Sequence, residues 1–319
     1  MASSAKLQYS DSTTARRPSG ILWKEIVKHK YLYLLLTPLV IFYIIFSYIP
    51  MYGVLLAFKE FDYSKGIIGS PWNHFANFSA VFGNPDFWTA FRNTILISMG
   101  RLIIEFPIPI VLALLLNEIS KGRLTRVFQT VFTFPHFISW VVLSGIIIGI
   151  FSDQGLYNQV LTLFGAEKAS VLTSGPGFTV VLFISNIWKE AGWSCILYLA
   201  AIAGINPELY EAVSVDGANR FQQMRAITWP VLKSTAAILL ILAVGNVMNG
   251  GFDQIFNLYN SAVYAYSDII DTFVYRSAFT DATGFGFSTT VGLLKSAINF
   301  ALLFGANYIV VRFGKEEGL

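Results

Sequence analysis

The side chains that most often carry catalysis or bind metals are few and scattered in this sequence. The histidines are His29, His74 and His136, and the one cysteine is Cys195. Metal sites and nucleophilic catalysis need several such groups together, and these four show no ligand spacing. A phosphate-binding Gly-x4-Gly-Lys-Ser/Thr loop is also missing from the sequence. We therefore expect no catalytic residue, no metal site and no cofactor in this chain, and the protein is not predicted to be an enzyme.

Polar side chains inside the long apolar runs are better candidates for function. A charge at membrane depth costs about 2.5–3.5 kcal/mol and usually faces a cavity or a partner. Arg101 and Glu105 are four residues apart, a spacing that favours an ion pair on one helix face. Asn186, Glu190 and Trp193 follow each other at i, i+4 and i+7, which predicts one helix face that lines a cavity.

A second set of polar residues lies in the last two apolar runs. Asn246 and Asn249 are three residues apart, and Lys295 and Asn299 are four apart. Amides and aromatic rings suit the hydroxyls and the apolar faces of sugars. Amides also form hydrogen bonds between packed membrane helices, and both interpretations remain open.

The charges in and beside the apolar runs do not balance. Four cations accompany two acids, Glu105 and Glu190. The surplus of two positive charges favours either an acidic sugar, such as a uronate, or an acidic residue on a partner protein. The four cations are Arg92, Arg101, Lys189 and Lys295.

The apolar runs themselves predict six membrane-spanning helices. Hydrophobic residues make up 55% of the 319 residues and charged residues 13%, about half the charged share of a soluble domain. Residues 31–58 contain no Asp, Glu, Lys, Arg or His, and about 20 apolar residues suffice to cross a bilayer. A soluble helical core or a transmembrane barrel explains such runs less well. The predicted fold is an all-α integral membrane protein with further spans at about 93–117, 127–151, 178–203, 234–257 and 289–311.

Positive charge predicts the orientation of these spans, because Lys and Arg gather in cytoplasmic loops. With the N-terminus inside, the inner segments carry 14 of the 22 Lys and Arg residues. The outer segments carry four, which are Lys59, Lys65, Lys168 and Arg276. We expect a cytoplasmic tail over residues 1–30, a transmembrane domain over 31–311 and a cytoplasmic C-terminus over 312–319. The first apolar run is expected to be an uncleaved anchor.

A polar segment over residues 206–230 separates the fourth span from the fifth. Asn206-Pro207-Glu208 predicts a helix start with a capping Asn. Gly217 either permits a close backbone approach or separates two short helices, and Trp229-Pro230 is expected to end the segment. The segment has few basic residues to hold an anionic membrane surface. A protein partner is therefore favoured over the alternative of an interfacial helix lying on lipid.

The spacing within this segment matches a known signature. Glu211-Ala212-Val213 is followed after three residues by Gly217, and after nine more by Ile227, with Pro230 three positions later. This pattern resembles the Glu-Ala-Ala (EAA) signature of binding-protein-dependent ABC importer permeases, which ends in Leu-Pro where this chain has Trp229-Pro230. Val213 stands in place of the second Ala.

The resemblance extends over most of the chain outside the N-terminal tail. The stretches NPDFWTAFRNT and NIWKEAGWSCILYLAAIAGINPELYEAVSVDGANRF are similar to oligosaccharide permeases of the maltose-permease class. The stretch GFDQIFNLYNSAVYAYSDIIDTFVYR resembles the subgroup that imports polysaccharide fragments, such as the permease subunits of alginate importers.

This resemblance implies a type I ABC importer permease fold in the bacterial inner membrane, working by alternating access. Residues 206–230 would hold the cytoplasmic coupling helix, with Glu211 paired to a basic residue of an ATPase subunit and Gly217 at the turn. The implied partners are a second homologous permease, an ATPase dimer that binds ATP and Mg, an extracytoplasmic sugar-binding protein and membrane lipid, with no nucleic acid. The expected coupling residues are Glu211, Ala212, Gly217, Ile227 and Pro230. The expected substrate pathway comprises Asn186, Glu190, Trp193, Asn246, Asn249, Lys295 and Asn299.

Two other classes were weighed against this one. An ion-coupled secondary transporter typically shows internal repeats and midplane acidic residues, whereas this sequence shows no repeat and only two acids in its spans. A membrane enzyme would need a catalytic constellation, which the isolated histidines and single cysteine do not supply.

Overall fold

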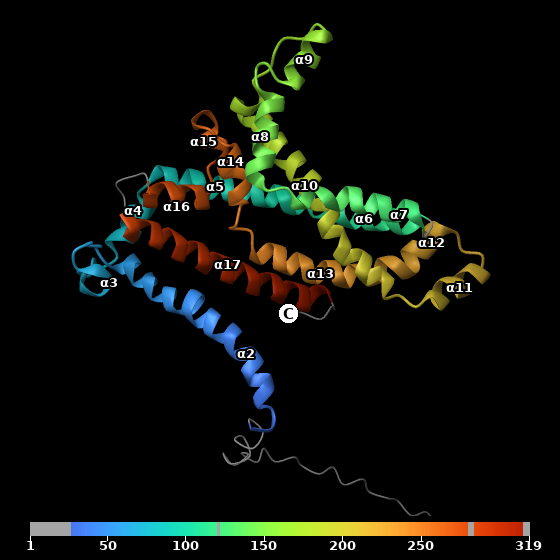
Figure 1. Cartoon of the computed structure of the whole chain (residues 1–319), viewed down its shortest axis with the longest axis horizontal. Coiled ribbons are helices and arrows are strands. Elements are labelled where there is room, and N and C mark those ends of the chain that lie inside the picture. The colour runs from blue at the N-terminus through green and yellow to red at the C-terminus, as the bar shows by residue number, and fades with distance from the viewer. Residues whose placement is uncertain (1–26, 120–121, 280–283, 315–319) are drawn as a thin grey trace, which may run out of the picture. The chain divides into compact units, whose positions relative to one another are not determined.

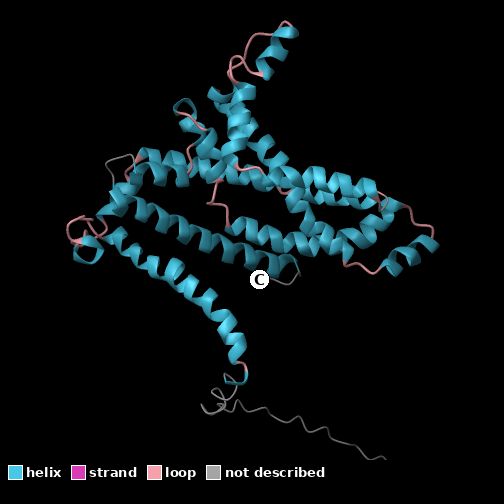
Figure 2. Cartoon of the chain, in the orientation of Figure 1, coloured by secondary structure: helices cyan, strands magenta, loops and turns pink. Residues whose placement is uncertain are grey.

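The computed structural model describes residues 27–119, 122–279 and 284–314. The predicted N-terminal tail lies mostly outside the described residues, as does most of the predicted C-terminal segment. Within the described ranges the chain is helical and contains no β-strand, and one isolated bridge pairs Lys59 with Trp72 (Figure 2). The chain divides into two units, Met1–Gly53 and Val54–Leu319.

The described part of the first unit, residues 27–53, is helical and contains no buried residue. Helix α2 spans Lys30–Tyr43 and continues through a π-helical turn, Ile44–Tyr48, into a 3-10 stretch, Ile49–Phe58, that crosses the boundary into the second unit. No residue of α2 is buried. A long, apolar and fully exposed helix is what a lipid-facing span requires.

The second unit contains the remaining helices, labelled in Figure 1. Two helix pairs organise it: α10 packs along α6, and α13 lies beside α17. The α-helices are α3 (Gly66–Gly69), α4 (Ala76–Phe82), α5 (Pro85–Gly100), α6 (Pro107–Glu118), α7 (Arg123–Thr133), α8 (Trp140–Phe151), α9 (Leu156–Leu163), α10 (Gly175–Ala203), α11 (Pro207–Val215), α12 (Arg220–Gln223), α13 (Trp229–Gly245), α14 (Phe252–Leu258), α15 (Tyr264–Ser267), α16 (Ile270–Phe279) and α17 (Gly284–Gly314).

Short helical turns of other types connect these elements. π-helical turns at Arg101–Glu105 and Met224–Thr228 join α5 to α6 and α12 to α13 without a loop. 3-10 turns occupy Phe134–Phe137, Val171–Thr173 and Ser261–Val263. A π turn inserts one extra residue into the helix and so rotates the side chains that follow it.

Among the residues that the structure describes, six helical runs are long and apolar enough to cross a membrane, which confirms the predicted fold class and number of spans. They are Lys30–Phe58, Pro85–Glu118, Trp140–Leu163, Gly175–Ala203, Arg220–Gly245 and Gly284–Val310. The predicted bounds of the third and fifth spans are wrong. The third begins at Trp140 because Pro135 and a capping Ser139 separate it from α7. The fifth begins much earlier than residue 234 and ends at Gly245, before a non-helical break.

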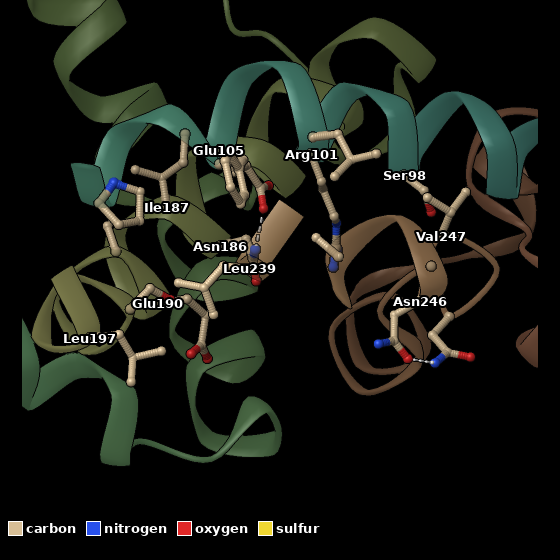
Figure 3. Close-up of a pocket in the computed structure, with 18 of the residues that line it drawn as sticks. Ser98, Arg101, Glu105, Asn186, Ile187, Glu190, Leu197, Leu239, Asn246 and Val247 are labelled. Carbon is tan, nitrogen blue, oxygen red and sulfur yellow. Dashed lines mark hydrogen bonds between the residues drawn. The ribbon is translucent and has the colours of Figure 1, made fainter. Parts of the chain in front are cut away.

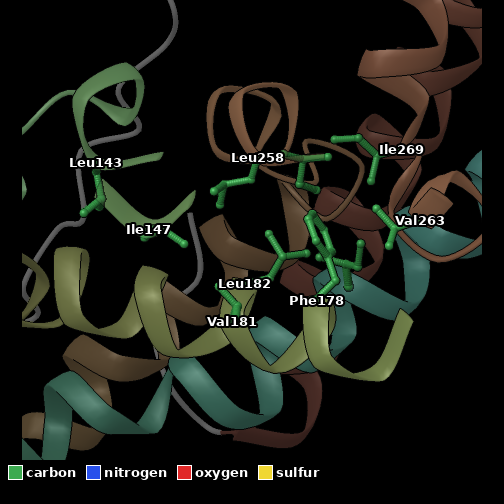
Figure 4. Close-up of a cluster of buried hydrophobic side chains, with 10 residues drawn as sticks. Leu143, Ile147, Phe178, Val181, Leu182, Leu258, Val263 and Ile269 are labelled. Atoms are coloured by element: carbon green, nitrogen blue, oxygen red, sulfur yellow. The ribbon is translucent and has the colours of Figure 1, made fainter. Parts of the chain in front are cut away.

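Three apolar clusters hold the second unit together. The first joins α8, α10 and α14 through Leu143, Leu182 and Ile255 among others (Figure 4). The second surrounds Met248, Phe273 and Val291. The third fixes α6, α10 and α13 against one another, and its buried members are Ile110, Ala113, Leu116, Cys195, Tyr198, Ile202, Ile205 and Leu232. Together these clusters position the second, fourth and fifth spans around a cavity.

Candidate functional site

A cavity of about 340 Å³ lies between the second, fourth and fifth spans. Its polar lining comes from the π turn after α5, from α10, and from the break that follows α13 (Figure 3). Four of the seven residues predicted for the substrate pathway line it, namely Asn186, Glu190, Asn246 and Asn249. The cavity thus combines a largely apolar lining with a small set of polar side chains.

Arg101 and Glu105 line the cavity but do not form the ion pair that their spacing predicts. The Arg101 Nη2 atom donates to Oε1 of Gln254 at 2.6 Å, and the Glu105 Oε2 atom accepts from Nδ2 of Asn186 at 2.5 Å. The π turn Arg101–Glu105 explains the difference, because its extra residue turns the two side chains apart. The Arg101 Nε and Glu105 Oε1 atoms are buried without a hydrogen-bond partner. Both side chains therefore keep hydrogen-bonding capacity.

A compact charged cluster lies beside the cavity. One Glu190 carboxylate oxygen lies 2.7 Å from Nδ1 of His136, and the other lies 3.0 Å from Nζ of Lys189. Lys189 is 5% exposed and donates to the His136 carbonyl at 2.6 Å. Adjacent residues on a helix are not expected to pair, yet the long Lys189 side chain reaches the neighbouring carboxylate. Trp193 stacks on the His136 ring at 4.4 Å and is not among the residues that line the cavity.

The fifth span contributes amides from a break in its helix. After Gly245 the chain turns through Asn246, and Asn249 donates from Nδ2 to the Asn246 Oδ1 atom at 2.8 Å. The break ends at Gly251, whose φ of +89° lies in the left-handed region that glycine tolerates. A Cβ atom there would collide with the Arg101 guanidinium. Glycine at this position therefore lets the arginine approach the broken segment.

The structure places the remaining predicted pathway residues elsewhere. Lys295 on α17 pairs with Asp271 on α16, with 2.5 Å between Nζ and Oδ1. Asn299 accepts from the Met248 backbone N–H at 3.1 Å. Neither lines the cavity, so their pathway role, like that of Trp193, stays a prediction. Sequence reasoning missed His136 and Gln254, because each meets its partner through tertiary packing that no local spacing signals.

The segment 206–230 forms two helices with a bend between them. Asn206 caps α11 by accepting from the Glu208 N–H at 3.1 Å. Gly217 has φ +81°, and the hydrogen bonds Ala218 N to Val213 O and Gly217 N to Ser214 O form a Schellman C-cap. Asn219 then starts α12 with a capping box.

The predicted coupling residues differ in exposure. Glu211, Ala212 and Gly217 are exposed, whereas Ile227 is partly buried against the third cluster. Trp229-Pro230 does not end the segment, contrary to the prediction. The helix continues through it into α13, because Pro230 falls in that helix's first turn, where its missing N–H costs nothing.

An ion pair outside the spans fixes the connection between the fifth and sixth spans. Arg276 donates to both oxygens of Asp268, at 2.7 Å to Oδ2 and 3.2 Å to Oδ1, and Thr272 also donates to this carboxylate at 2.8 Å. The hydrogen bonds to Asp268 raise the pKa of Arg276 above its ordinary value. Asp268 is buried, so this fork-shaped contact holds α16 in place.

Comparisons with known proteins give the family. Residues 105–313 match the model of the family described as binding-protein-dependent transport system inner membrane component. The chain is 41% identical to Protein LplB of Bacillus subtilis, covering 96% of each protein. It is 39% identical to the polygalacturonan/rhamnogalacturonan transport system permease protein YteP of the same organism, covering 92% of each.

Solved structures agree with this match. A chain of a bacterial ABC transporter involved in the import of the acidic polysaccharide alginate superposes with a TM-score of 0.84 at 36% identity, over 92% of this chain and 99% of that chain. A chain of a bacterial alginate ABC transporter in complex with an alginate pentasaccharide-bound periplasmic protein superposes with the same TM-score of 0.84 at 36% identity, over 93% of this chain and 99% of that chain. The match does not favour the alternative of an ion-coupled secondary transporter. This chain belongs to the family of binding-protein-dependent inner membrane components, and it is a membrane-spanning permease subunit of an ABC importer.

Proposed function

We propose that this permease takes an acidic oligo- or polysaccharide fragment from an extracytoplasmic binding protein and passes it to the cytoplasm by alternating access. A second homologous permease would complete the pathway, and an ATPase dimer would bind ATP and Mg. The observation that carries the proposal is the cavity, whose polar lining combines Arg101 and three asparagines with the carboxylates of Glu105 and Glu190, which can accept hydrogen bonds from sugar hydroxyls. Guanidinium and amide groups bind carboxylates and hydroxyls, the groups that an acidic sugar presents.

The acidic character of the substrate is supported by two independent similarities. Over more than nine tenths of its length the chain is similar both to a polygalacturonan/rhamnogalacturonan permease and to an alginate importer subunit. The cation surplus in the spans does not itself support it, because Lys295 pairs with Asp271 and Lys189 with Glu190. Arg101 is the cation that lines the cavity and has a buried Nε atom without a partner.

The orientation and the coupling role follow from the same proposal. The Lys and Arg distribution supports a cytoplasmic position for both termini and for the segment 206–230. The exposed Glu211 and the bend at Gly217 would then face the ATPase. A short helix with an exposed carboxylate suits a cleft lined by basic side chains.

The test uses the complex assembled from this chain, its partner permease, ATPase and binding protein in proteoliposomes. Oligogalacturonides and alginate oligosaccharides should support uptake, and neutral maltooligosaccharides of the same length should not. Arg101→Gln should raise the half-saturating concentration for acidic oligosaccharides about tenfold, as loss of one charge-assisted contact of about 1.4 kcal/mol would do. Arg92→Gln is the matched control, because Arg92 lies on the same helix and donates to the Ala265 carbonyl, away from the cavity. Uptake of neutral but not acidic oligosaccharides would refute the proposal.

A further inference from the structure

A continuous row of aromatic rings runs over the second unit from α14 to the loop after the first span. The rings of Phe256, Tyr275, Phe279, Phe285 and Tyr63 follow one another, and we call these five residues the aromatic track. Successive ring centroids are 4.8, 5.2, 6.1 and 6.1 Å apart. Five rings from four separate segments thus form one unbroken series, with steps comparable to the length of a sugar unit.

The rings on α14 and α16 are at least partly exposed because each helix buries one face in an apolar cluster and leaves the opposite face open. On α14, Ile255 and Leu258 enter the first cluster, while Phe256 remains partly exposed. On α16, Phe273 enters the second cluster and Tyr275 and Phe279 lie on the other side, 41% and 70% exposed. Burial of large rings normally stabilises a fold, so a row of rings left open is available for a partner.

Lipid does not account for this row. Four of the five rings lie outside the six candidate spans, on the seven-residue helix α14, the ten-residue helix α16 and the loop at Tyr63, and the fifth, Phe285, lies at the very start of the sixth span. Polar groups accompany the rings along both helices. Asp253 is exposed and Asn257 is partly exposed beside Phe256 on α14, and Asp271 and Arg276 flank Tyr275 on α16. Apolar faces interleaved with hydrogen-bonding groups match the surface of a saccharide, whose rings have apolar faces and hydroxyl edges.

The track also leads to the cavity. Helix α14 begins directly after the break whose residues Asn249 and Gly250 line the cavity, and its Gln254 accepts the hydrogen bond from Arg101. The same short helix therefore carries a partner of the cavity arginine and, at Phe256, the first ring of the track. A saccharide chain that extends from the cavity along α14 would meet Phe256 as the first ring of the track.

We propose that the aromatic track is a binding surface for the part of a saccharide chain that extends beyond the cavity. This inference rests on the proposed function and adds to it a means of selecting long chains. Stacking on ring faces does not depend on which hydroxyls a sugar carries. The track therefore recognises chain length, while the cavity recognises the sugar itself.

The test measures uptake by the assembled complex with oligogalacturonides from dimer to hexamer. The double variant Tyr275→Leu with Phe279→Leu keeps apolar side chains and removes the ring faces. The half-saturating concentration of the hexamer should rise about tenfold, equivalent to about 1.4 kcal/mol, and that of the dimer should stay within about twofold. The single variant Tyr275→Trp keeps a ring face at this position and should behave like the unmodified protein.

The control is a second exposed ring pair on a candidate span. Phe300 and Phe304 on α17 have ring centroids 4.5 Å apart, and Phe300→Leu with Phe304→Leu should leave uptake unchanged at every length. An equal effect of the track variant on dimer and hexamer, or no effect, would overturn the inference. Loss of the partner permease on size-exclusion chromatography would also overturn it, because the row would then be a subunit contact. If neutral oligosaccharides are taken up instead, the proposed acidic specificity fails and the same length series tests the track with them.

Discussion

Position 217 offers a sharp test of the role of the segment 206–230, because it needs a glycine only for the backbone conformation and not for space. Its φ is +81°, and a Cβ atom there would meet no other atom within 4 Å. An L-residue in the left-handed region costs roughly 1–2 kcal/mol, which is about a 5- to 30-fold change in population. Gly217→Ala should therefore disfavour the bend between α11 and α12 by this factor without any steric clash.

The assay compares oligosaccharide uptake with ATP hydrolysed in proteoliposomes that contain the assembled complex. Gly217→Ala should lower the uptake per ATP at least about fivefold if the bend must keep its shape. Gly217→Asn should recover most of the loss, because asparagine tolerates the left-handed region better than other L-residues.

The structure supplies a matched control at the end of α9. Gly165 has φ +74°, has free space around a Cβ position, and closes the same type of C-cap through the hydrogen bonds of Ala166 to Leu161 and of Gly165 to Thr162. Gly165→Ala carries the same local strain outside the segment 206–230 and should leave uptake per ATP unchanged. Equal effects of the two alanine variants, or normal coupling in Gly217→Ala, would refute the reasoning.

Two further variants test stability and coupling. Asp268→Asn removes the charge that holds Arg276 and should lower the free energy of unfolding by roughly 3 kcal/mol, measured as a lower unfolding temperature in detergent, whereas Asp153→Asn, at an exposed turn after α8, should not change that temperature. Glu211→Ala should reduce uptake per ATP while leaving assembly intact, and Glu208→Ala, on the same helix α11, is its control. An equal effect of the two glutamate variants would contradict a specific contact at Glu211.

The number of spans could be predicted from the sequence, but not where each of them begins and ends. Hydropathy measures the free energy of transfer into lipid and does not show where the chain changes direction between two helices. It therefore merged α7 with α8, although Pro135 and the Ser139 cap separate them. It also began the fifth span after Lys233, whereas the helix already includes Arg220. Charged residues in the first turns of a spanning helix look like loop residues in the sequence.

Some residue pairs of the site could be predicted from their spacing and others could not, and local helix geometry explains the difference. Asn186 and Glu190 share a cavity because α10 is a regular helix, for which the 3.6-residue period holds. The same period failed for Arg101 and Glu105 because a π turn lies between them. Contacts such as Gln254 with Arg101, across 153 residues, depend on how helices pack and have no signal in the local sequence.

The fifth span provides the physical connection between the two proposed functional regions. Helical residues run without a loop from Arg220, next to the bend at Gly217, to Gly245, where the break that lines the cavity begins. At about 1.5 Å per residue such a helix is a rigid element. Because Leu232 is fully buried in the third cluster, the helix is held at a point between its two ends. The helix thus connects the exposed segment 206–230 to the break whose Asn246 and Asn249 line the cavity, and a force applied by an ATPase at the exposed end would be transmitted toward the cavity along it.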